Sequence, residues 1–161
     1  MLYSEFTASD VQKILQEIFP LRRLVLSQFT FFNHIGVGKP TGETFKRNRR
    51  CYKLTDILPI ACVLSLKEKG IPLKNVSDVP RLIQENSLSI FTSQSPIRLS
   101  GVGEKVHLDL NNPENLAIME LLENPTSTNV FWSFDVSAVA LQILDITERL
   151  FGVTEKQRAF A

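Results

Sequence analysis

The first seventy residues contain two stretches in which apolar residues recur at helical spacing. The first stretch, residues 7–19, opens with a weak capping box formed by Thr7 and Asp10 and stops at Pro20. Its apolar positions are Val11, Ile14, Leu15, Ile18 and Phe19. The pattern predicts an amphipathic helix that buries one face.

The second stretch, residues 54–70, predicts another helix. We expect Thr55 to be its N-cap and Gly70 to be its C′ residue. Pro59 is tolerated because the first N–H groups of a helix have no intrahelical partner. The expected buried positions are Ile60, Val63, Leu64 and Leu66.

Residues 21–34 lie between these stretches and predict a third helix with two different sides. The apolar side carries Leu21, Val25, Phe29 and Phe32. The polar side carries Arg23, Ser27, Thr30 and His34, with Gln28 near its edge. A helix that reads a DNA groove has this pattern, but so does an ordinary surface helix.

The second half of the chain alternates apolar and polar residues over short runs. Residues 87–93, 96–100 and 105–110 predict two or three strands of a small antiparallel sheet, and residues 129–134 predict another strand. A helix is predicted from Asn112-Pro113 to Glu123, because Asn followed by Pro is a good N-cap and N1 pair.

The last predicted element is a helix from Val136 to Phe151 with an unusually apolar surface. A 3-4-3-4 spacing places Val136, Val139, Ile143, Ile146 and Leu150 in one stripe. Leu141, Leu144 and Phe151 widen that stripe. Two interpretations stay open at this point: packing inside its own domain, or association with a second copy of the chain.

Composition indicates a globular protein of the cytoplasm. The chain has 161 residues, 43% of them hydrophobic, and no apolar run approaches the ~20 residues of a membrane span. The two cysteines, Cys51 and Cys62, have no His or Cys at ligand spacing, so we expect reduced thiols.

Positive charge gathers in the first half. Residues 1–84 carry thirteen Lys and Arg against seven Asp and Glu, whereas residues 85–161 carry five against ten. The densest basic run is Lys46, Arg47, Arg49 and Arg50. Such segregation suggests that the first half meets a polyanion, although a solvated loop has the same composition.

Residues 31–37 (FFNHIGV), a loop with glycine and proline, and residues 50–76 (RCYKLTDILPIACVLSLKEKGIPLKNV) form a spaced series of motifs. The series resembles the N-terminal DNA-binding domain of the MerR family of transcriptional regulators. The matching positions are Phe31-Phe32, Ile35-Gly36-Val37, Arg50-Cys51-Tyr52, Asp56, Lys67-Glu68-Lys69-Gly70 and Leu73. The chain departs from the family where Ser27 and Thr30 stand in place of a common Arg, and where Phe replaces Tyr in the aromatic pair.

The resemblance implies a winged helix-turn-helix whose basic wing lies along the phosphate backbone of double-stranded DNA. The residues expected to contact DNA are Arg22, Arg23, Ser27, Gln28, Thr30, Lys46, Arg47, Arg49, Arg50 and Tyr52. One helix-turn-helix reads little sequence, so we favour a homodimer. Its expected interface is Val136, Val139, Ile143, Ile146 and Leu150.

The predicted fold class is α+β: a mainly helical MerR-like winged helix-turn-helix over residues 1–84, and an assembly region of sheet and helices over residues 85–161. The predicted function is that of a DNA-binding transcriptional regulator. The alternatives are a protein-interaction module with a winged-helix fold and an architectural or recombination accessory DNA protein. No catalytic, metal-binding or cofactor-binding motif occurs, so we expect no enzyme activity. The sequence does not identify an effector.

Overall fold

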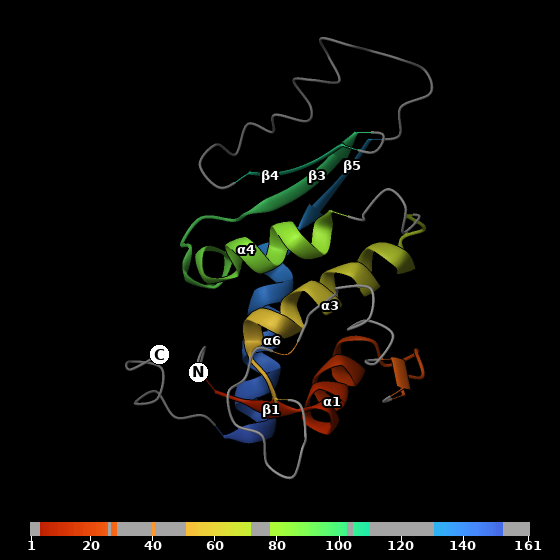
Figure 1. The fold of residues 1–161 in the computed structure, drawn as a ribbon, viewed down its shortest axis with the longest axis vertical. Helices are drawn as coiled ribbons and strands as arrows, with labels where there is room; N and C mark the ends of the chain where they lie inside the picture. The colour runs from red at the N-terminus through yellow and green to blue at the C-terminus, as the bar shows by residue number, and fades with distance from the viewer. Residues whose placement is uncertain are drawn as a thin grey trace.

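The computed structural model describes residues 4–25, 27–28, 40, 51–71, 78–102, 105–109 and 131–152. These residues form the predicted α+β fold (Figure 1). The helices are α1 (Ala8–Ile18), α3 (Leu54–Glu68), α4 (Val79–Thr92) and α6 (Val136–Phe151). The strands are β1 (Phe6–Thr7), β2 (Cys51–Tyr52), β3 (Arg98–Val102), β4 (Lys105–Asp109) and β5 (Phe131–Asp135).

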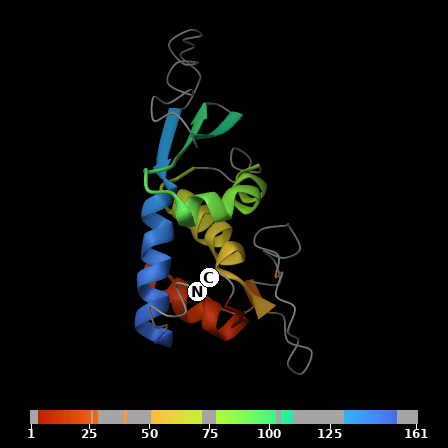
Figure 2. The same ribbon diagram turned by 90° about the vertical axis from the view of Figure 1, so that its left-hand side faces the viewer.

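The helix α6 runs along the length of the molecule, from the three-stranded sheet at one end to α1 at the other (Figure 2). The helices α1, α3 and α4 all pack against it. One continuous core therefore joins residues from both halves of the chain. The predicted domain boundary between residues 84 and 85 falls inside α4, so the chain does not divide at that point.

The start of α1 confirms the predicted capping box. The N–H of Asp10 donates to Thr7 Oγ1 at 3.2 Å, and the N–H of Thr7 donates to Asp10 Oδ2 at 2.9 Å. The face formed by Val11, Ile14 and Leu15 is fully buried. The apolar spacing thus identified the buried face of this helix correctly.

The chain after α1 differs from its prediction. Residues 21–25 are not helical, and Leu21 is fully exposed, so the predicted helix does not begin at Leu21. Glutamines on α1 hold this segment in a turn instead. The amide of Gln16 donates to the carbonyls of Phe19 and Arg22, and that of Gln12 donates to the carbonyl of Leu24.

The helix α3 is buried along almost its whole length and begins one residue before the predicted N-cap. Asp56 Oδ2 accepts a hydrogen bond from the N–H of Lys53, which is the N-cap in place of Thr55. The helix ends in a Schellman motif at Gly70, whose φ of 81° favours glycine. In that motif Ile71 N–H donates to the carbonyl of Leu66 at 3.1 Å.

A proline inside α3 links this helix to α4. Pro59 has no N–H, so the Thr55 carbonyl lacks its usual partner four residues on. Ser87 Oγ on α4 lies 3.3 Å from that carbonyl and 2.5 Å from the carbonyl of Ile83 on its own helix. Its single hydroxyl hydrogen therefore serves mainly Ile83 and only weakly Thr55. Residues 87–93 were predicted as a strand, but residues 87–92 belong to α4. Their alternation was misleading, because Ile83, Ser87 and Ile90 are buried at helical spacing.

The sheet at the other end confirms three predicted strands. Its order is β4-β3-β5 and both pairings are antiparallel. Leu99 faces Leu108 on one side and Phe134 on the other, and this face of the sheet continues the core. The predicted helix over residues 112–123 lies outside the described residues.

The apolar stripe of α6 is part of the chain's own core. Val136, Val139, Ile143 and Ile146 are buried, and Leu150 is 37% exposed. The predicted dimer interface is therefore wrong, because α1, α3 and α4 already cover the stripe. At the far end of α6, Arg149 donates a hydrogen bond of 2.8 Å to the carboxylate of Glu17, and this bond raises the pKa of Arg149.

The two cysteines are free thiols, and both are buried. Burial raises the pKa of the Cys62 thiol, so its reactive thiolate is suppressed. In a Cys51→Ala variant we expect Cys62 to react with a disulfide reagent at pH 8 several orders of magnitude more slowly than in urea. Equal rates in the native and unfolded states would contradict its burial.

Among the described helices, none is both long and apolar enough to cross a membrane.

Candidate functional site

Five of the predicted DNA-contacting residues lie within the described part of the chain. Arg22 and Arg23 stand on the turn after α1, where Arg23 is exposed and Arg22 half-buried. Ser27 is exposed. Gln28 Oε1 accepts the N–H of Val25 at 3.2 Å, so part of its side chain holds the local backbone. Thr30, Lys46, Arg47, Arg49 and Arg50 lie outside the described residues.

Tyr52 has a different role from the predicted one. Its side chain is 1% exposed and packs in the core. It lies on β2, opposite Phe6 of β1, which is buried as well. A buried ring presents no surface to DNA, so the structure contradicts Tyr52 as a DNA contact. Tyr52 instead packs strand β2 against the core.

Tyr52 fixes the position of strand β2, which directly follows the basic run in the sequence. The run ends at Arg50, and β2 begins at the next residue, Cys51. Cys51 is paired with Thr7, the residue that caps α1. The end of the basic run is thereby tied to the N-terminal end of α1, whose C-terminal end leads into the turn carrying Arg22 and Arg23.

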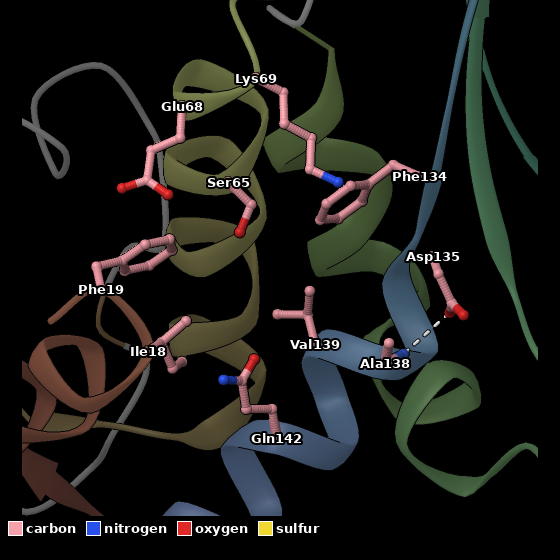
Figure 3. Close-up of a pocket in the computed structure, with 10 residues that line it drawn as sticks. All are labelled: Ile18, Phe19, Ser65, Glu68, Lys69, Phe134, Asp135, Ala138, Val139 and Gln142. Carbon is pink, nitrogen blue, oxygen red and sulfur yellow. Dashed lines mark hydrogen bonds between the residues drawn. The ribbon is translucent and has the colours of Figure 1, made fainter. Parts of the chain in front are cut away.

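A pocket of about 320 Å³ lies where α1, α3 and the junction of β5 with α6 meet (Figure 3). Its apolar lining comes from three separate segments: Ile18 and Phe19 at the C-terminal end of α1, Phe134 on β5, and Ala138 and Val139 on α6. Its polar lining is Ser65, Glu68, Lys69, Asp135 and Gln142.

Lys69 and Phe134 form a cation–π pair at this pocket. The Lys69 ammonium lies 5.1 Å from the centroid of the Phe134 ring. Asp135, the next residue, uses Oδ1 to accept the N–H of Ala138 at 3.0 Å and thus caps α6. Within the described ranges Lys69 forms no ion pair with any carboxylate.

Sequence reasoning missed this pocket. Lys69 was named only within the Lys67-Glu68-Lys69-Gly70 segment of the MerR-like series, and Phe134 only within a predicted strand. The residues come from three distant segments that only the packing of α6 brings together, so no local spacing could indicate the site. The described residues contain no group of three His, Cys, Asp or Glu side chains that could hold a metal ion.

No protein-family model matches the chain, and no curated protein is significantly similar to it.

Proposed function

We propose that the first half of the chain binds double-stranded DNA as a MerR-like winged helix-turn-helix, and that the protein acts as a transcriptional regulator in the cytoplasm. The observation that carries the proposal is the anchoring of the basic run. Its last residue adjoins β2, which pairs with β1 at the cap of α1. In the sequence, four cations in five residues directly precede this paired strand.

The exposed arginine after α1 supports the same assignment. Arg23 stands on a turn whose carbonyls at Phe19, Arg22 and Leu24 are all held by glutamines of α1. A guanidinium on such a supported turn loses less freedom on binding than one on an unsupported loop. Arg23 and the basic run would then contact DNA backbone or bases from two segments joined to the same helix.

The proposal does not include the α6 dimer. The stripe that suggested self-association is buried inside the chain. We therefore propose DNA binding by the single chain, with affinity carried mainly by phosphate contacts. Such contacts release counterions, so binding weakens steeply as salt increases.

We expect the double variant Arg47→Ala/Arg50→Ala to reduce the steepness of this salt dependence. Each lost phosphate contact lowers the slope of log K against log salt by about 0.9, so two contacts lower it by about 1.8. Fluorescence anisotropy with a labelled random duplex across a salt series measures this slope.

The matched control is Lys67→Ala/Arg81→Ala, which removes two positive charges from exposed positions on α3 and α4. Its slope should equal that of the unmodified protein. Equal slopes in both double variants would remove the basic run from the interface. Absence of duplex binding at low salt would instead favour the protein-interaction module.

A further inference from the structure

The pocket between α1, α3 and α6 combines an apolar wall with polar groups that the fold does not use. Figure 3 shows Ser65 and Gln142 directed toward the space beside Val139. Neither side chain makes a hydrogen bond to another described residue. The side of the pocket between α3 and α6 therefore offers a hydroxyl and an amide to a bound molecule.

The ammonium of Lys69, at the edge of the pocket, also forms no ion pair with a described carboxylate. It lies over the ring of Phe134. Asp135 is occupied as the cap of α6, and Glu68 extends on the opposite side of α3, toward Phe19 (Figure 3). An ammonium on an aromatic face, beside a pocket with an apolar wall, suits an anion attached to an apolar body.

The other charged residues of the pocket restrict the kind of anion. Glu68 and Asp135 line the same pocket, so a doubly charged phosphate would meet repulsion that a single carboxylate meets less strongly. The volume of about 320 Å³ lies at the lower end of the range for small-molecule sites. It suits one ring or one branched aliphatic group.

We propose that this pocket binds a small monocarboxylic acid with an aromatic or branched apolar body. The carboxylate lies at the Lys69 ammonium, and Ser65, one turn earlier on the same helix, offers it a hydroxyl. The apolar body lies against Phe19, Phe134 and Val139. This site is separate from the DNA contacts and does not depend on them.

Benzoate tests the proposal, with benzamide as its uncharged counterpart. We expect saturable benzoate-induced shifts in the ¹H–¹⁵N NMR spectrum at Lys69, Phe134 and Val139. Benzamide should bind about tenfold more weakly, which corresponds to about 1.4 kcal/mol. Lys69→Met keeps an apolar side chain on Phe134 and should lower benzoate affinity to that of benzamide.

The matched control Lys67→Met removes a charge from an exposed position two residues away and should leave benzoate affinity unchanged. A second variant, Ala138→Trp, places a large ring at an exposed lining position and should abolish binding of both compounds. The spectra of the three variants also report whether each is folded. Equal affinities for benzoate and benzamide, an unchanged affinity in Lys69→Met, or the absence of saturable shifts would each overturn the proposal. Binding that persists in Ala138→Trp would overturn its location.

Discussion

Replacing Ile143 by Glu is expected to unfold the protein. Ile143 is fully buried at the middle of α6, the helix that contacts α1, α3 and α4. Glu at this position would put a carboxylate into an apolar core and also remove a large buried side chain. The combined cost is above about 4 kcal/mol, comparable with the whole stability of a small domain. Urea denaturation followed by circular dichroism measures it.

Leu141→Glu is the matched control, because Leu141 lies two residues away on the same helix and is 65% exposed. This variant should stay folded, with a free energy of unfolding within about 0.5 kcal/mol of the unmodified protein. Because both variants introduce Glu into α6, the difference between their stabilities reports the effect of burial and not that of helix propensity. A folded Ile143→Glu monomer with unchanged stability would show that the stripe faces outward and would restore self-association as an explanation.

Local signals predicted the ends of several elements correctly. Thr7 and Asp10 form the capping box, and Gly70 ends α3 with positive φ, because both features depend on residues within one turn. Three of the short alternating runs became β3, β4 and β5. In each case the chemistry that fixes the structure lies inside the segment itself.

Features that depend on packing were not predictable in this way. The apolar stripe of α6 was identified, but the same stripe fits a second copy or the chain's own helices, and only the fold decides between them. Residues 87–93 alternate like a strand, yet residues 87–92 are helical, because Ile83, Ser87 and Ile90 are buried at helical spacing. The pocket likewise exists only because α6 brings Phe134 beside Lys69.

The three-stranded sheet contains one close contact, between Gly101 and Trp132, at which a substitution should strongly lower stability. Gly101 on β3 lies opposite Trp132 on β5, and the tryptophan ring rests on the glycine backbone. A Cβ added at Gly101 would lie 2.2 Å from Cε2 of Trp132, far inside van der Waals contact. Trp132 is itself buried, so its ring cannot turn away without disturbing the core.

Gly101→Ala is therefore expected to destabilise the protein by about 1–3 kcal/mol, although alanine suits a strand better than glycine. Trp132→Val removes the ring while keeping a residue that favours strands, and in that background the same change should cost nothing or stabilise slightly. The double-mutant cycle, measured by urea denaturation, should give a coupling of about 1–3 kcal/mol between the two positions. An equal cost of Gly101→Ala in both backgrounds would mean that the ring does not lie on Gly101. The pairing of β3 with β5 would then have a different register, and Phe134, two residues along β5, would no longer be fixed opposite Leu99 and beneath Lys69.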